Sequence, residues 1–228
     1  MSTGAYPAVA LPQHGSSSRS PRARGSVSAP LLLAGLCVVA LAVLWLLATH
    51  VEATRVRDAE LLRHFALIEG ERVNDVARGL LHLLEPGPFT IWAAAIVLFA
   101  IARNRPRLAL AVAVVMAFAP ISADLLKPLL AEPHVGFGRT IGAGSWPSGH
   151  ATAATALALS ALLVTPRRWW ALAAPLALAF IAAVGVALLI RVWHMPSDVL
   201  GGYLLGTLWI ALAVSCLRAA DRRWPRRR

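Results

Sequence analysis

Two short polar sequences in a largely apolar chain hold side chains capable of acid–base and nucleophilic chemistry. PSGH occupies residues 147–150, and HMPSD follows about 40 residues later at residues 194–198. A neutral imidazole can attack phosphorus when a carboxylate holds its other ring nitrogen, and a second imidazole can protonate the departing oxygen. His194, Asp198 and His150 are therefore of the right types to cleave a phosphate ester without a metal ion.

The spacing of His194 and Asp198 favours contact between their side chains. They are four positions apart in the sequence, and on a continuous helix that separation brings two side chains together. Pro196 between them is equally consistent with a helix that starts there, because proline is favoured in the first helical turn.

Three other residues suit phosphate binding. A helix that starts with Ser148 and Gly149 presents free amides and the positive end of its dipole, and the serine can cap the helix at the same time. Lys127 is the only lysine among the 22 lysines and arginines, which favours a site that takes a compact ammonium group. An isolated lysine near a span also commonly extends to the membrane interface.

The elements that carry these residues are long apolar segments. The chain has 228 residues, of which 58% are hydrophobic and 14% charged, which predicts an all-α integral membrane protein. A helix needs about 20 mainly apolar residues to cross the hydrocarbon core. We predict one six-transmembrane-helix bundle over residues 30–217, in which the second and fourth spans are short; the spans are residues 30–49, 89–102, 108–126, 151–164, 169–190 and 199–217.

The charged residues indicate the orientation of this bundle. With a cytoplasmic N-terminus, the inside segments hold 14 arginines and one acid, Asp221, whereas the outside segments hold ten acids and eight bases. This positive-inside asymmetry predicts that both termini are cytoplasmic. Because the basic residues flank the spans, the net charge of +11 indicates contact with anionic inner-leaflet lipid and not with nucleic acid.

The segments outside the spans differ in composition. Residues 1–29 are rich in Ser, Gly, Pro and Arg and predict a disordered cytoplasmic tail ahead of a retained membrane anchor, and residues 218–228 a basic cytoplasmic tail. Residues 51–87 hold seven of the eleven acids and leucines at roughly helical spacing. They are predicted to form either an extracytoplasmic amphipathic loop that covers the site or a solvated connector.

The predicted topology brings the polar residues together at the extracytoplasmic face. Lys127 ends the third span, PSGH opens the fourth, Arg191 follows the fifth, and HMPSD opens the sixth. Ionisable groups next to hydrocarbon are costly and tend to be functional, so their convergence at one depth predicts a site. Cys37 and Cys216 fall inside spans, and neither a disulfide framework nor a metal site is predicted.

Lys127 in LLK, together with PSGH and HMPSD, resembles the type-2 phosphatidic acid phosphatase family, which shares its catalytic core with the vanadium haloperoxidases. The resemblance covers roughly residues 127–206. It implies that His194 is the nucleophile, Asp198 its orienting partner and His150 the general acid, with no cofactor. By the same resemblance, phosphate is bound by Lys127, Ser148 and Gly149.

Two arginines of the family pattern are missing from their usual places. The family has a lysine, six intervening residues and then Arg-Pro, and at the Arg-Pro positions this chain has His134 and Val135. It has Ser-Arg six to seven residues before the histidine, where this chain has Ala187 and Leu188. The available substitutes for phosphate binding are Arg139 and Arg191, although Arg191 also suits a simple interface anchor.

The sequence thus predicts a multi-pass cell-membrane lipid phosphatase that works through a phosphohistidine without a metal ion. Its substrate is predicted to be phosphatidic acid, phosphatidylglycerol phosphate, or a polyprenyl phosphate or diphosphate. The missing arginines leave open a non-catalytic descendant that binds or transports phospholipid. Ser148 also leaves open an intramembrane serine protease, and no protein partner is indicated.

Overall fold

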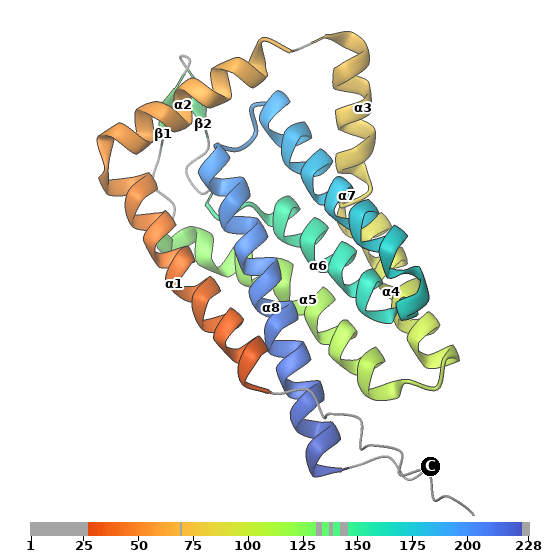
Figure 1. The fold of residues 1–228 in the computed structure, drawn as a ribbon. Helices are drawn as coiled ribbons and strands as arrows, with labels where there is room; N and C mark the ends of the chain where they lie inside the picture. The colour runs from red at the N-terminus through yellow and green to blue at the C-terminus, as the bar shows by residue number, and fades with distance from the viewer. Residues whose placement is uncertain (1–26, 69, 131–133, 137–138, 142–145, 225–228) are drawn as a thin grey trace, which may run out of the picture.

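The computed structural model describes residues 27–68, 70–130, 134–136, 139–141 and 146–224. Six of its helices form an elongated bundle in which each predicted apolar segment is helical (Figure 1). These helices are α1 (Ser28–His50), α4 (Pro86–Ala102), α5 (Pro106–Leu130), α6 (Gly149–Val164), α7 (Trp170–Ile190) and α8 (Pro196–Arg223).

By length and apolar composition, four or five of the described helical stretches qualify as membrane spans, so the predicted six crossings stay a prediction. Four helical stretches of the described chain are long and apolar enough to span a bilayer: α1, α5, residues 167–190 and α8. A bent pair, α3 (Glu71–His82) with α4, makes a fifth if it counts as one span, with a break of 55°. With 16 residues, α6 has a length of only about 24 Å at 1.5 Å per residue, less than the hydrocarbon thickness of about 30 Å.

Helix α6 lies at the centre of the bundle, in contact with α4, α5, α7 and α8. Its alanines, threonines and serines are mostly buried, and their small side chains let neighbouring helices approach closely. Gly202 and Gly206 of α8 form a matching small-residue face. An added Cβ would lie 2.6 Å from the Ser148 carbonyl oxygen at Gly202 and 2.7 Å from Thr155 Cβ at Gly206. The first turn of α6 is thereby pressed against α8.

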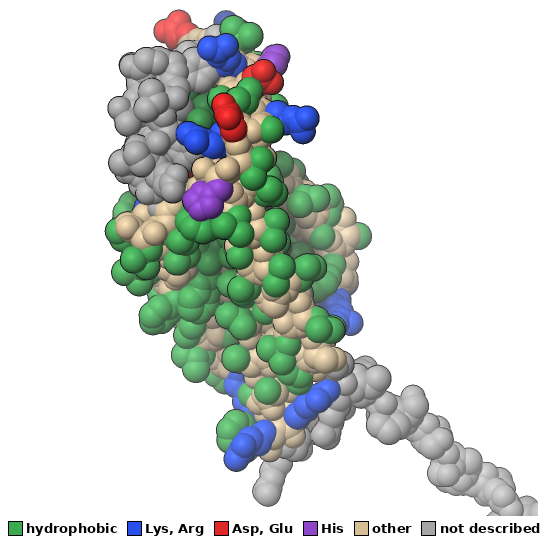
Figure 2. Space-filling model, turned by 90° about the vertical axis from the view of Figure 1, so that its left-hand side faces the viewer, with side chains coloured by type: hydrophobic (Ala, Val, Ile, Leu, Met, Phe, Trp, Pro, Cys, Tyr) green, Lys and Arg blue, Asp and Glu red, His purple; other side chains and the backbone are tan. Residues whose placement is uncertain are grey.

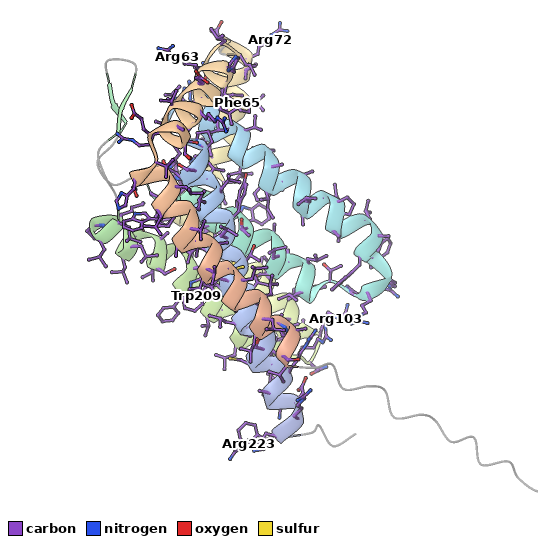
Figure 3. All side chains as sticks on the ribbon, turned by 60° about the vertical axis from the view of Figure 1, so that its left-hand side comes forward. Arg63, Phe65, Arg72, Arg103, Trp209 and Arg223 are labelled. Atoms are coloured by element: carbon purple, nitrogen blue, oxygen red, sulfur yellow. The ribbon has the colours of Figure 1, made fainter. Side chains whose placement is uncertain are left out.

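An apolar belt surrounds the bundle. In Figure 2, hydrophobic side chains cover the middle of the face, acidic, basic and histidine side chains gather at one end, and basic side chains at the other. Figure 3 places Arg63 and Arg72 at the first end and Arg103 and Arg223 at the second. Leucines such as Leu32, which is 73% exposed, point outward from the belt. A protein of this kind belongs in a membrane.

The connection at residues 51–87 forms two helices at the end with mixed charges (Figure 1). Helix α2 (Glu52–Ala66) contacts α7 and α8, and α3 contacts α7. Leu62 of α2 and Leu81 of α3 are buried in one hydrophobic cluster with residues of α6, α7 and α8. The segment is therefore packed on the bundle, which a solvated connector would not be.

Three smaller features complete the fold. Strands β1 (His134–Gly136) and β2 (Arg139–Ile141) pair antiparallel, with Val135 opposite Thr140, and form a short hairpin beside an otherwise helical fold that agrees with the predicted all-α class. A 3-10 turn, η1 (Arg167–Trp169), precedes α7. Helix α8 continues through residues 218–223 of the predicted basic tail, while residues 1–26 and 225–228 of the two predicted tails lie outside the described chain.

Candidate active site

The PSGH sequence forms the start of α6. Ser148 is the N-cap, and its Oγ accepts a hydrogen bond from the Ala151 amide at 3.3 Å. The hydroxyl therefore caps the helix, and the residue is fully buried, which is unfavourable for a serine nucleophile. Helix α6 begins at Gly149, and the first amides of a helix lack carbonyl partners within it. This terminus is suited to binding an anion.

Lys127 lies directly beside this helix terminus. A Cβ built on Gly149 would be 3.5 Å from the Lys127 ammonium and 3.6 Å from Asp124 Oδ1. Lys127 Nζ also donates to Asp124 Oδ1 at 2.7 Å, and its side chain is 29% exposed. The lysine therefore extends toward the PSGH turn and is partly neutralised by Asp124. A phosphate arriving at the α6 terminus would meet both the ammonium and the amides.

The HMPSD sequence forms the start of α8 and joins His194 to Asp198. Helix α8 begins at Pro196, so the helix starts at the proline and does not pass through it. Asp198 Oδ2 accepts a hydrogen bond from the Met195 amide at 2.9 Å and lies 3.4 Å from His194 Nδ1. An ionised carboxylate only accepts, so Asp198 favours the tautomer with hydrogen on Nδ1. The lone pair of His194 Nε2 is then free to act as a nucleophile.

The turn between α7 and α8 places His194. The Val192 amide donates to the Leu189 carbonyl, and the Trp193 amide to the Leu188 carbonyl, both within 3.1 Å. This is the Schellman arrangement, in which the residue after the C-cap takes a left-handed conformation. That residue is usually glycine, but here it is Val192 with φ 52°. A β-branched side chain in this region is strained, and such strain is typical of functional sites.

A backbone contact ties the two polar turns together. The Ser148 amide donates to the Asp198 carbonyl at 3.0 Å, so the cap of α6 is hydrogen-bonded directly to the first turn of α8. Trp146, which is 4% exposed, packs against Gly201 on the next turn of α8. PSGH and HMPSD, about 40 residues apart in the sequence, therefore form one site.

His150 is half-buried in the first turn of α6, just before the predicted span that begins at Ala151. Its ring centroid lies 5.9 Å from that of Trp193, with the planes tilted by 58°. Trp193 directly precedes His194 in the sequence, so the ring next to His150 belongs to the residue adjacent to the other histidine of the site.

The electrostatic surroundings of His150 identify the other charged groups of the site. Burial lowers the pKa of His150 below its usual value, and electrostatic repulsion by the nearby basic groups His194 and Lys127 acts in the same direction. The carboxylates of Glu85 and Asp124 act against this lowering. The three basic groups predicted from the sequence are thus close enough to influence one another.

Arg191 is engaged with α3 and with the following turn. Its Nη1 lies 3.5 Å from Asn74 Oδ1, and its guanidinium carbon 5.5 Å from the centroid of the Trp193 ring. Its Nε is buried without a hydrogen-bond partner among the described residues, so it retains a free donor. Arg139 lies in β2, but its side chain is outside the described part of the structure. A role for either arginine in phosphate binding stays a prediction.

The position where the family pattern has its second arginine is filled by the hydrophobic core. Leu188 is fully buried and Ala187 is 4% exposed, and both belong to the cluster that contains Leu62 of α2 and Leu81 of α3. The α2–α3 segment therefore packs where a charged side chain would otherwise need space. Among the described residues, no group of three or more His, Cys, Asp or Glu side chains is arranged to hold a metal ion.

Residues 108–222 match the family model of the PAP2 superfamily. The match covers half of the chain and includes Lys127, PSGH and HMPSD. The chain belongs to the PAP2 superfamily. The resemblance to the type-2 phosphatidic acid phosphatases is thereby confirmed.

The fold of this PAP2 protein has a counterpart among solved structures. It is similar to the crystal structure of the first transmembrane PAP2-type phosphatidylglycerolphosphate phosphatase from Bacillus subtilis, with a TM-score of 0.66 and 22% sequence identity. The similarity covers 87% of this chain and 98% of that chain. No curated protein sequence matches this PAP2 protein.

The structure adds residues that the sequence reasoning did not single out. Asp124 forms an ion pair with Lys127, and Trp193 lies beside the His150 ring. The charge of Glu85 acts to raise the pKa of His150. Asp124 carried a usable signal, because it is the only charged residue within the six predicted spans and such residues tend to be functional. Glu85 and Trp193 carried none, since their roles depend on packing between distant elements.

Proposed function

We propose that this PAP2 protein is a membrane lipid phosphatase that removes a phosphate or diphosphate group through a phosphohistidine at His194. The observation that carries the proposal is the approach of the HMPSD turn to the PSGH turn, with Lys127 Nζ beside Gly149. One anion at this place would meet a nucleophile, a second imidazole and a cation. The chemistry needs no metal ion, because fixed positive groups stabilise the transferring phosphoryl oxygens.

In the first step, His194 Nε2 attacks phosphorus in line with the ester oxygen, and the phosphorus–oxygen bond to the lipid breaks. Asp198 holds Nδ1 and stabilises the positive charge that develops on the ring. Lys127 and the amides at the start of α6, including that of Gly149, bind the equatorial oxygens. Arg191 and Arg139 are proposed to supply further positive charge. In the family pattern this charge comes from two arginines that this chain lacks.

In the same step, His150 donates a proton to the departing alkoxide. Its lowered pKa keeps the imidazole neutral at pH 7 in the empty site, and a phosphate dianion bound beside it raises that pKa again. Substrate binding thus supplies the protonated acid. In the second step, neutral His150 takes a proton from water, which attacks the phosphohistidine and releases inorganic phosphate.

The site is proposed to face the extracytoplasmic side of the cell membrane, in a multi-pass chain with both termini cytoplasmic. Support comes from the charges: of the two ends of the belt, the one opposite the site carries the arginine clusters that the positive-inside rule places in the cytoplasm. The substrate class is a lipid phosphate such as phosphatidic acid, phosphatidylglycerol phosphate, or a polyprenyl phosphate or diphosphate. The likeness in fold to a phosphatidylglycerolphosphate phosphatase makes phosphatidylglycerol phosphate the first to test.

Purified protein is expected to release phosphate from at least one of these lipids, to remain active in EDTA and to be inhibited by vanadate. Vanadate mimics the phosphate in its transition state, and the proposed groups include no metal. The measurement is phosphate release in detergent micelles across the lipid panel, with and without EDTA.

Two results would contradict this proposal in different ways. Activity that disappears with EDTA and returns with a divalent ion would exclude the phosphohistidine scheme. Tight binding of a lipid phosphate without any release across the panel would favour the alternative, a non-catalytic lipid-binding or transport protein, which the core-filling Leu188 makes physically plausible.

The proposed orientation predicts which positions are accessible from outside sealed cells. In a background with Cys37 and Cys216 replaced by alanine, Gly136→Cys is expected to react with a membrane-impermeant thiol reagent. Arg167→Cys is expected to react only after the membrane is opened, because residues 167–168 lie in a predicted cytoplasmic loop. Labelling in the reverse order would place the site at the cytoplasmic face.

A further inference from the structure

Asp58 of α2 binds the first turn of α8. Its Oδ2 accepts a hydrogen bond from the Ser197 hydroxyl at 2.6 Å, and its Oδ1 from the Ser197 amide at 3.1 Å. The two residues are 139 positions apart in the sequence, and Ser197 is only 4% exposed. A carboxylate outside the HMPSD sequence thus holds the residue directly before Asp198.

This contact adds a capping hydrogen bond to the start of α8, where Asp198 Oδ2 already accepts from the Met195 amide. The N-cap residue of α8 is Met195, whose thioether is a weak acceptor and makes no capping hydrogen bond. The amides of Asp198 and Val199 donate to the Met195 carbonyl, and the Ser197 amide donates to Asp58. The negative charge of Asp58 also suits the positive end of the helix.

Asp58 is itself held in place by packing. Leu62 lies one turn further along α2, which puts it on the same face as Asp58, and it is fully buried in the cluster with Leu188 and Met195. The carboxylate is therefore attached to the same core that carries the end of α7 and the start of α8. Movement of α2 would move the HMPSD turn.

We propose that Asp58 is a positioning residue for phosphoryl transfer. By holding Ser197 it fixes the first turn of α8, and with it the distance and angle between Asp198 Oδ2 and His194 Nδ1. The Schellman turn at Val192 holds the other side of His194, so the nucleophile lies between two fixed points. The inference rests on the proposed function, and it assigns the α2–α3 segment a part in catalysis through the protein backbone.

The test compares Asp58→Ala with Asp58→Asn in purified, monodisperse protein. Loss of the cap in Asp58→Ala is expected to lower kcat about tenfold with KM within about twofold, because the orientation of the nucleophile changes and the binding groups remain. Asp58→Asn keeps an acceptor oxygen for the Ser197 amide and is expected to recover most of kcat. The matched control is Asp75→Ala, which removes an exposed acid of α3 paired with Arg78 and is expected to leave kcat unchanged.

A second measurement does not depend on turnover. Nitrogen NMR of the histidine rings, with the His194 signal assigned from His194→Gln, reports its tautomer. The wild-type ring is expected to carry its proton on Nδ1, and Asp58→Ala to show a mixture of tautomers. Unchanged kcat per folded molecule together with an unchanged tautomer would overturn the inference, even if Asp58→Ala unfolds at a lower temperature. A wild type without activity would contradict the proposed function alone, and the tautomer measurement would still decide the role of Asp58.

Discussion

The His194→Ala protein is expected to insert and fold as the wild type does, but to release phosphate at least about 10²-fold more slowly. The change removes the proposed nucleophile, which is held by Asp198 at 3.4 Å and has a side chain only 12% exposed. Its structural cost is limited, because the ring lies in a turn between α7 and α8 and outside both helices. The measurement is phosphate release per folded molecule from the best substrate of the lipid panel.

The covalent intermediate gives this prediction an independent check. After rapid acid quenching with radiolabelled substrate, wild-type protein is expected to carry phosphate on a histidine, and His194→Ala to carry none. The matched control is His64→Ala, which removes an exposed imidazole of α2 whose Nδ1 lies 2.9 Å from the Glu60 carbonyl oxygen of its own helix. Wild-type turnover in His194→Ala would show that another group attacks the phosphate.

The effect of removing the His150 imidazole on turnover is expected to depend on the leaving group of the substrate. His150→Ala should lower turnover of alkyl lipid phosphates at least about 10²-fold, because a departing alkoxide needs a proton. With p-nitrophenyl phosphate, whose leaving group is stable as an anion, the first step should be nearly unaffected. The comparison of the two substrates in His150→Ala and wild type measures the proton transfer directly.

Hydrolysis of the phosphohistidine, the second step, gives an independent check on proton transfer by His150. Because water must lose a proton as it attacks the phosphohistidine, His150→Ala is expected to accumulate labelled phosphoenzyme from p-nitrophenyl phosphate. An equal loss on both substrates, with no accumulation, would mean that His150 positions the phosphate and does not transfer a proton. In that case Asp124 and Glu85, the two carboxylates whose charges act on His150, become the candidates for proton transfer.

Hydropathy and motif spacing predicted the helices and the two polar sequences that meet in the candidate site, because both depend on residues close in the sequence. The six apolar segments are helices, and PSGH and HMPSD begin two of them. The serine cap at Ser148 and the start of α8 at Pro196 also follow from local preferences for helix termini. Length alone marked α4 and α6 as the segments least able to cross the bilayer by themselves.

Only the tertiary structure decided how these parts act on one another. The contact between Asp58 and Ser197 joins residues 139 positions apart, and no local pattern encodes which carboxylate caps a distant helix. The left-handed turn at Val192 was not predictable from the sequence either, because glycine is the residue usually found in that conformation after a helix. The close packing of Gly202 and Gly206 on α6 brings PSGH to HMPSD. Each of these depends on helix packing, which selects among conformations that the local sequence allows.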